Sequence, residues 1–486
     1  MEDMNYGKME DSNNQIVENM NNEKIEDTNN QIVEDINNDK EKKEIPIVLI
    51  NYIFSYLSEH SWKILYKSSN EKLSIEIIMA LGMEEYFKEV LLSYKFKNRL
   101  CFEASKRGYL TTLKWARDNG CKWNWKICSI AAFKGYLNIL QWARKNGCPG
   151  NSYIDDFKIN YLRENTCEIS ESAAKGGHLH ILQWARKNGY DWDSRTCMFA
   201  ASAGHLDILQ WLRQNGCNWN SDTCTYAALR NKLDVLQWAR ENGCPWDEDT
   251  CSAAALGGNL DCLIWLRQNG CPWDSKTCSH AAANGHLNCL QWAREHGCDW
   301  NSHTCRAAAL RNKLDVLQWA RQNGCDWDEE TCRAAADRGH LNILQWAREN
   351  GCPWDEKTCR AAALSGHLYI LQWLQQNGCP WDSYTCSFAA LRNKLDVLQW
   401  ARQNGCPWDA YTCCAAALGG NLDCLIWLRQ NGCEWDSDTC TNAVTGGHLN
   451  CLQWARENNC TWDRKKCLSL AKSKKYIEMI TWIEKN

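Results

Sequence analysis

The chain has 486 residues, among them 28 Trp and 31 Cys but only 7 Pro and 8 Phe. This skew is typical of a short unit copied many times, which replaces the usual expectation of several globular domains at this length. The formal net charge of −4 gives a field too weak to favour nucleic-acid binding on charge alone. No run of about eighteen apolar residues is present, so we expect no membrane span.

The start of the chain, Met1–Asn5, lacks a basic region followed by an apolar run, so no secretory signal is expected. Without an export route, we interpret the cysteines as reduced thiols rather than as a disulfide framework. The predicted location is the cytoplasm, with the nucleus left open.

Residues 1–43 form an acidic, Asn-rich segment with twelve acids against five Lys. A sequence of the form MEDSNNQIVENMNN at position 9 returns as IEDTNNQIVEDINN at position 25. Its apolar residues could form a weak amphipathic helix, but the composition favours a disordered tail.

Residues 44–97 are predicted to be helical, and the run IPIVLINYIFSYL at 45–57 resembles the start of an F-box. Val48 stands where that pattern has an acid, and the later Val-Cys-x-x-Trp portion is not recognisable. The alternative is a helical pair that shields the first repeat. The resemblance implies contact with a ubiquitin-ligase adaptor through Pro46, Leu49, Ile53, Phe54 and Leu57.

From Cys101 onward the chain is periodic. Trp residues recur every 27 positions from Trp184 to Trp454, whereas the step from Trp142 to Trp184 is 27 plus 15. The extra residues form an insert at 150–166, which we predict to be a surface excursion from the array.

One unit, Asp193–Asn220, shows the expected hairpin. An acid or Asn caps a first helix of roughly ten residues, and Gly204, or Asn in other units, ends it. A second helix ends at Asn215-Gly216, and the loop residue Trp219 is expected to anchor neighbouring units. The small face of the first helix and the buried stripe of the second are predicted to be Cys197, Ala200 and Ala201, then Leu206, Ile208, Leu209, Trp211 and Leu212.

The run GHLDILQWLRQNGCNWN at Gly204–Asn220 is similar to the ankyrin second helix and return loop, GHLEIVKLLLEHGADVN. The resemblance covers residues 98–486. It implies an all-α, ankyrin-type helix-hairpin solenoid of about 13–14 repeats that acts as a protein–protein interaction scaffold, with no enzymatic activity and no cofactor. Ankyrin units usually have about 33 residues, so we expect these units to lack the β-hairpin fingers. Short Trp- and Cys-rich units also resemble those encoded by giant DNA viruses, which implies a host protein as partner.

Several polar residues recur at fixed positions of the unit. The spacing of pairs such as Cys271 and Cys278 exceeds that of zinc ligands, so the cysteines and the turn histidines such as His286 are interpreted as structural. One Arg follows the Trp of most second helices, as Arg213 does, which leaves nucleic-acid binding as a remote alternative. No phosphate loop, HExxH motif or nucleophile–base pair is recognisable.

The candidate partner-binding residues vary on the first helix and its turn while the repeat frame stays fixed. Their side chains should lie outside the core, so replacing them should not change the thermal stability of the fold. Arg306, Arg333 and Arg360 are expected to form a basic stripe, or else solvated pairs of Glu329 with Arg333 and Glu356 with Arg360. The full set is Met198, Phe199, Tyr226, Arg230, His280, Arg306, Arg311, Arg333, Arg338, Arg360, Phe388 and Arg392.

The predicted function is a monomeric scaffold that binds a protein, and the viral resemblance implies that this protein belongs to the host. The alternative is an F-box-type substrate receptor that links a target to a ubiquitin ligase through residues 45–88.

Overall fold

A computed structural model of the chain describes residues 94–124, 126–149 and 167–486. The predicted acidic tail, the insert at 150–166 and the F-box-like positions Pro46, Leu49, Ile53, Phe54 and Leu57 lie outside these residues. The described chain begins inside the predicted N-terminal segment, and its first helix, α7 (Tyr94–Arg107), runs through the predicted boundary at residue 97.

The chain divides into two compact units, Met1–Asp191 and Trp192–Asn486. The described helices of the first unit form three consecutive hairpins. These hairpins are α7 with α8 (Leu110–Asp118), α9 (Lys126–Lys134) with α10 (Leu137–Lys145), and α11 (Cys167–Gly176) with α12 (Leu179–Lys187).

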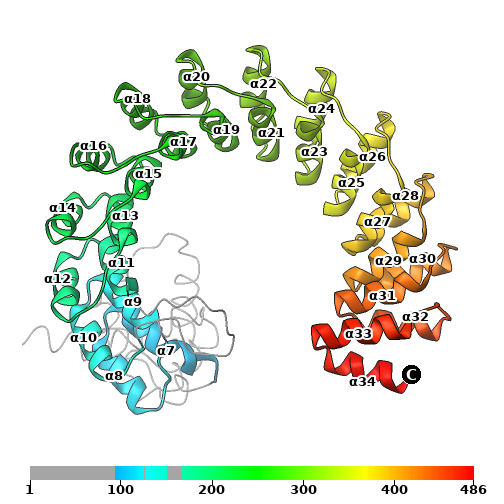
Figure 1. Cartoon of the computed structure of the whole chain (residues 1–486), viewed down its shortest axis with the longest axis horizontal. Helices are drawn as coiled ribbons and strands as arrows, with labels where there is room; N and C mark the ends of the chain where they lie inside the picture. Colours follow the sequence, from blue (N-terminus) through cyan, green and yellow to red (C-terminus); the bar gives the residue numbers. More distant parts are fainter. Residues whose placement is uncertain (1–93, 125, 150–166) are drawn as a thin grey trace, which may run out of the picture. The chain divides into compact units, whose positions relative to one another are not determined.

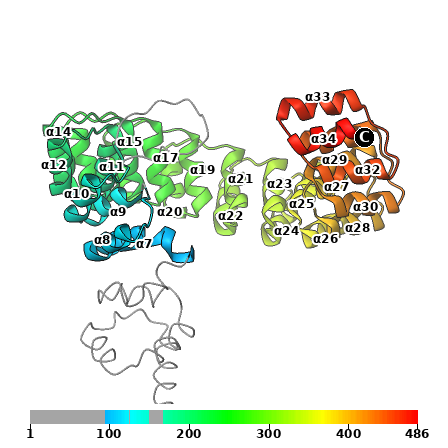
Figure 2. The ribbon, with the colours of Figure 1, turned by 90° about the horizontal axis from the view of Figure 1, so that it is seen from below.

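The second unit continues the same pattern through eleven hairpins, each with a first and a second helix. Neighbouring hairpins such as α21/α22 and α23/α24 form successive layers (Figure 2). The first helices are α13 (Ser194–Ala203), α15 (Ser221–Leu229), α17 (Glu248–Gly257), α19 (Ser275–Asn284), α21 (Ser302–Leu310), α23 (Glu329–Arg338), α25 (Glu356–Ser365), α27 (Ser383–Leu391), α29 (Ala410–Gly419), α31 (Ser437–Gly446) and α33 (Arg464–Lys474). The second helices are α14 (Leu206–Gln214), α16 (Leu233–Glu241), α18 (Leu260–Gln268), α20 (Leu287–Glu295), α22 (Leu314–Gln322), α24 (Leu341–Glu349), α26 (Leu368–Gln376), α28 (Leu395–Gln403), α30 (Leu422–Gln430), α32 (Leu449–Glu457) and α34 (Ile477–Lys485).

The described residues contain no strand, and the predicted all-α helix-hairpin solenoid is confirmed. The first helix α13 starts and ends as its sequence predicts. The Asp193 side chain accepts a hydrogen bond from the backbone N–H of Arg195 at 2.9 Å, and Gly204 closes the helix at φ +87°. Where the turn carries Asn in place of Gly, Asn231 adopts the same left-handed backbone at φ +56°.

Side-chain size explains how the hairpins of the second unit stack. The first helices bury small residues such as Cys197, Ala200 and Ala201, which lets neighbouring first helices pack closely. The second helices make far fewer contacts with one another. The second unit therefore curves, with its first helices along its inner side and its second helices along its outer side (Figure 1).

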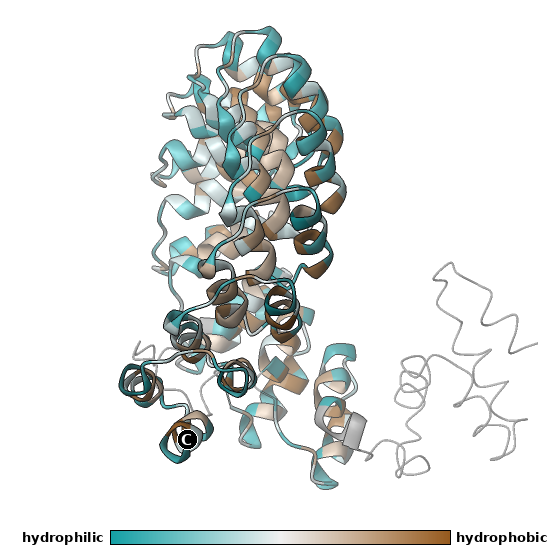
Figure 3. Cartoon of the chain, turned by 90° about the vertical axis from the view of Figure 1, so that its right-hand side faces the viewer, coloured by the Kyte–Doolittle hydropathy of each residue, from teal (hydrophilic) through white to brown (hydrophobic). Residues whose placement is uncertain are grey.

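The second helices bury a narrower stripe than predicted. Ile208, Leu209 and Leu212 are fully buried, whereas Leu206 and Trp211 are only partly covered. Hydrophobic residues accordingly concentrate between the helices, while the loops are mostly hydrophilic (Figure 3). Trp211 lies outside the core because it packs edge-on against the loop residue Trp192, with ring centroids 5.5 Å apart.

The Arg that follows the second-helix Trp is part of the repeat frame. The Arg240 guanidinium lies 4.1 Å from the ring centroid of Trp246 and donates a hydrogen bond to the backbone oxygen of Cys244 at 3.2 Å. Trp246 then packs against Trp265 of the following hairpin at 5.8 Å between centroids. Arg240 therefore holds the loop residue Trp246 in place. Trp246 in turn contacts the next hairpin, as predicted for the loop Trp.

The turn residue before each second helix covers the preceding unit. The His286 ring lies so close to Gly258 that a Cβ there would meet His286 Nδ1 at 2.5 Å. Asn259 instead donates hydrogen bonds to the backbone oxygens of Ala228 at 2.7 Å and Leu229 at 3.0 Å. These contacts account for the recurring histidines as structural residues.

Candidate functional site

The predicted binding residues lie in different environments. Met198 is buried, with 8% of its surface exposed, so its side chain belongs to the core, contrary to the expectation for this set. Phe199 and His280 are partly covered, whereas Tyr226 is exposed.

Four predicted arginines lie at the ends of first helices. Arg230, Arg311 and Arg392 are the exposed C-cap residues of α15, α21 and α27. Arg338 is the last residue of α23, and its side chain pairs with Asp337 at 3.4 Å. None of these four lines the pocket described next.

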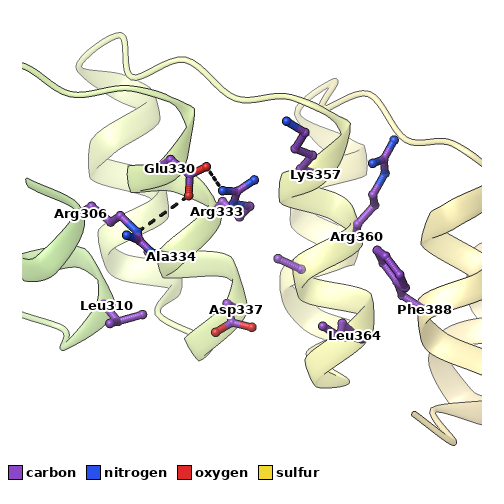
Figure 4. Close-up of a pocket in the computed structure, with 11 residues that line it drawn as sticks. Arg306, Leu310, Glu330, Arg333, Ala334, Asp337, Lys357, Arg360, Leu364 and Phe388 are labelled. Carbon is purple, nitrogen blue, oxygen red and sulfur yellow. Dashed lines mark ion pairs between the residues drawn. The ribbon is translucent and has the colours of Figure 1, made fainter. Parts of the chain in front are cut away.

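One pocket gathers the remaining predicted residues, Arg306, Arg333, Arg360 and Phe388 (Figure 4). It has a volume of about 400 Å³ and lies across the first helices α21, α23, α25 and α27. Its other lining residues are Leu310, Glu330, Ala334, Asp337, Lys357, Ala361 and Leu364. We call the surface formed by these eleven residues the inner groove.

Arg306 and Arg333 share one carboxylate. Arg306 Nε lies 3.8 Å from Glu330 Oε2, and Arg333 pairs with the other oxygen of Glu330 (Figure 4). The partner of Arg333 is thus Glu330, three residues earlier, and not the expected Glu329.

Arg360 has a different role from the other two arginines. Its Nε donates to Asp382 Oδ1 at 3.0 Å, a second nitrogen pairs with Asp382 Oδ2, and Glu356 lies 3.4 Å away as expected for an i,i+4 pair. The guanidinium also lies 4.9 Å from the ring centroid of Tyr384. The hydrogen bonds that Arg360 donates to the Asp382 carboxylate raise the pKa of Arg360. Arg360 therefore links α25 to the N-cap of α27, and these contacts lead us to expect that its replacement destabilises the fold.

The exposure of the three arginines follows these contacts. Arg306 is 46% exposed, Arg333 31% and Arg360 21%. The exposed fraction of the predicted stripe therefore falls from α21 to α25. Its more exposed end consists of Arg306 and Arg333.

An aromatic cluster that sequence reasoning missed adjoins the inner groove. Tyr384 on α27 and Tyr411 on α29 are 46% and 48% exposed, with ring centroids 5.7 Å apart. Tyr384 also lies 6.2 Å from Phe388, which lines the pocket. Both tyrosines are the second residue of their helix, so a comparison of this position between units would have found them.

The cysteines serve the frame. Cys271 donates from its thiol to the backbone oxygen of Asp247 at 3.4 Å, and the equivalent loop cysteines bond the N-cap carbonyls of their own units. First-helix and loop cysteines of one hairpin also pair, as Cys197 and Cys217 do. The hydrogen bond with Cys217, together with burial, raises the pKa of Cys197. Within the described residues, no three His, Cys, Asp or Glu side chains are grouped as metal ligands would be.

Comparison with known proteins matches one segment to a family. Residues 171–213 match the family model for ankyrin repeats (many copies). This match includes the start of the run Gly204–Asn220, from which the ankyrin resemblance was predicted. No curated protein matches the chain. Among the described residues, no helix has the length and apolar character needed to cross a membrane.

Two solved structures show a distant likeness. The ankyrin repeat domain of human ASB11 is 17% identical, covers 32% of this chain and 84% of its own, and has a TM-score of 0.28. The pentatricopeptide repeat protein PPR10, in complex with an 18-nt psaJ RNA element, is 13% identical, covers 94% of this chain and 78% of its own, and has a TM-score of 0.31. At these TM-scores neither likeness indicates what this chain binds.

Proposed function

We propose that the chain is a protein-interaction scaffold that binds its partner along the inner side of the second unit, at the inner groove. The observation that carries this proposal is the gathering of Arg306, Arg333, Lys357 and Phe388 on four adjacent first helices. The core positions of these helices are filled by Cys and Ala, so the larger side chains are free to face a partner. Ankyrin repeats generally mediate protein–protein interaction, which supports this function.

The repeat frame argues against nucleic acid as the partner. A helical repeat that reads bases needs a polar or charged side chain free in each unit. The Arg that recurs in this array is stacked on a Trp and bonded to a loop carbonyl, as Arg240 is, so it cannot serve that purpose.

The second candidate function is a substrate receptor for a ubiquitin ligase. It is favoured by the F-box-like run at 45–57, with Pro46, Leu49, Ile53, Phe54 and Leu57 as adaptor contacts. In this form of the proposal the inner groove binds the target and residues 45–88 bind the adaptor. The resemblance of the units to those of giant DNA viruses makes a cytoplasmic host protein the proposed target.

Affinity capture with the full-length chain tests the proposal. A double variant, Arg306→Ala with Arg333→Ala, should lose the partner while its thermal unfolding stays unchanged. The matched control removes two exposed cations elsewhere in the second unit, Lys465→Ala with Lys474→Ala, and should retain the partner. Equal capture by both variants would place the binding surface outside the inner groove.

A deletion of residues 44–93 separates the two candidate functions. Ligase components that co-purify with the full chain and disappear with the deletion, while the target is retained, would establish the receptor function. Absence of ligase components from the full-chain capture would leave the scaffold function alone.

A further inference from the structure

The inner groove has spare positive charge at one end. Arg306 and Arg333 together carry ten N–H donors in two guanidinium groups, yet they share the single carboxylate of Glu330. The exposed Lys357 lies on the next helix, 4.0 Å from Asp355. The other acid in the lining, Asp337, accepts a hydrogen bond from Ser365 at 2.9 Å and pairs with Arg338. Among the lining residues, the charge left without a matched partner is therefore positive.

The other end of the groove is aromatic. Phe388 continues into Tyr384 and Tyr411, whose rings are about half exposed. Aromatic rings exposed side by side on a surface are favourable contacts for apolar side chains, because each buries a large area at small entropic cost. Arg360, engaged with Asp382 and Tyr384, separates this aromatic end from the cationic end.

The two ends are spaced for an extended peptide. The surface runs from α21 to α29, four steps between neighbouring first helices. At about 10 Å a step this is roughly 40 Å, the reach of about twelve residues in extended conformation.

We propose that the partner presents an extended segment with an acidic cluster at one end and aromatic or other large apolar side chains at the other. The acids bind Arg306, Arg333 and Lys357, and the apolar side chains pack on Phe388, Tyr384 and Tyr411. This inference rests on the proposed function and adds to it the chemistry of the partner. The groove selects for the order of the two parts as well as for composition, because its own two ends differ.

Single-stranded RNA would also meet cations and aromatic rings, but the distribution here favours a peptide. RNA-binding grooves follow the phosphate backbone with positive charge along their whole length. In the inner groove the cations that share one carboxylate, Arg306 and Arg333, lie on α21 and α23 only. On α25, Lys357 pairs with Asp355, and Arg360 is neutralised by Asp382 and Glu356. A short acidic segment fits that confined charge.

Fluorescence anisotropy with the full-length chain and labelled twelve-residue peptides tests the inference. The first peptide has four Asp or Glu residues at one end and three Phe, Tyr or Leu residues at the other, and a second has the two ends exchanged. A third replaces the acids by Asn and Gln, a fourth replaces the apolar residues by Ser, and a twelve-nucleotide single-stranded RNA serves as competitor. We expect one of the two orders to bind at least about tenfold more tightly than its amide and serine analogues, and to weaken as salt rises.

Variants assign the two ends. Arg306→Ala with Arg333→Ala should abolish the preference for the acidic peptide over its amide analogue, whereas Tyr411→Ala should abolish the preference over the serine analogue. The Lys465→Ala with Lys474→Ala control should bind like the unmodified chain, and thermal unfolding establishes that each variant is folded. Equal binding of the amide analogue, or tighter binding of the RNA, would overturn the inference.

The outcome is separable from that of the proposed function. If none of the peptides binds but partner capture still requires Arg306 and Arg333, the scaffold function stands and the partner chemistry is wrong. If capture is indifferent to these arginines, the proposed function itself fails.

Discussion

Replacing Arg360 with Ala should destabilise the second unit, whereas replacing Arg306 or Arg333 should not. Arg360 binds both carboxylate oxygens of Asp382 and lies over Tyr384, so it joins α25 to the start of α27. A partly exposed ion pair contributes about 0.5–1 kcal/mol, and a cation–π contact contributes a similar amount. The expected loss in the free energy of unfolding is therefore about 1–2 kcal/mol.

The two other arginines have weaker ties. Arg306 and Arg333 share Glu330 and are more exposed, so each replacement should change the free energy of unfolding by less than about 0.5 kcal/mol. The three single variants differ only in position, which makes them internal controls for loss of a positive charge.

Urea denaturation followed by far-UV circular dichroism measures the effect as a shift of the midpoint. A double-mutant cycle of Arg360→Ala with Asp382→Asn isolates the pair, because Asn removes the negative charge and is still a preferred N-cap residue. A coupling energy near zero, or an equal shift in the Arg306→Ala variant, would refute the assignment of Arg360 as a link between units.

Three further outcomes are expected from the frame. Gly258→Ala should lower the free energy of unfolding by about 2–4 kcal/mol, because a Cβ would both strain the backbone at φ +73° and strike His286. Gly270→Ala, at φ +79° with open space around it, should lower it by only about 1 kcal/mol in the same denaturation assay. Lys475→Gly should stabilise the last hairpin by about 0.5–1 kcal/mol in thermal unfolding, since Lys475 holds φ +59° where other turns use Gly or Asn; an unchanged midpoint would show that the backbone there is not strained. Burial raises the pKa of the Cys289 thiol from 9.0 to about 11. The contribution of this neutral thiol to stability is therefore full below pH 9 and is lost as the pH rises to about 11. Cys289→Ala should flatten the fall of the denaturation midpoint over that pH range, and an identical fall in the variant would contradict this assignment.

The sequence was sufficient for the hairpins because their determinants are local. An Asp or Asn cap, a Gly or Asn turn and an apolar stripe act within one unit, and Asp193, Gly204 and Ile208 all lie where the 27-residue period places them. The narrower stripe was missed because the covering of Trp211 depends on Trp192, nineteen residues before it.

The site was predictable only in outline. Register alone placed Arg306, Arg333 and Arg360 on successive first helices, and they do line one pocket. Their separate roles depend on acids from neighbouring units, because Glu330 lies beside Arg306 and Asp382 beside Arg360 only after stacking. The burial of Met198, at 8% exposed, likewise differs from the prediction.

The covering of each turn by the next hairpin gives the array a direction. His286 lies over Gly258, Lys313 over Gly285, and Tyr476 over Gly447, so a turn is finished only by residues that follow it in the chain. During synthesis, a hairpin leaving the ribosome would wait for its successor before its own turn is closed. A chain cut after residue 459 would keep the α31/α32 hairpin but leave Gly447 without Tyr476. Premature termination should therefore destabilise the last hairpin that has been made.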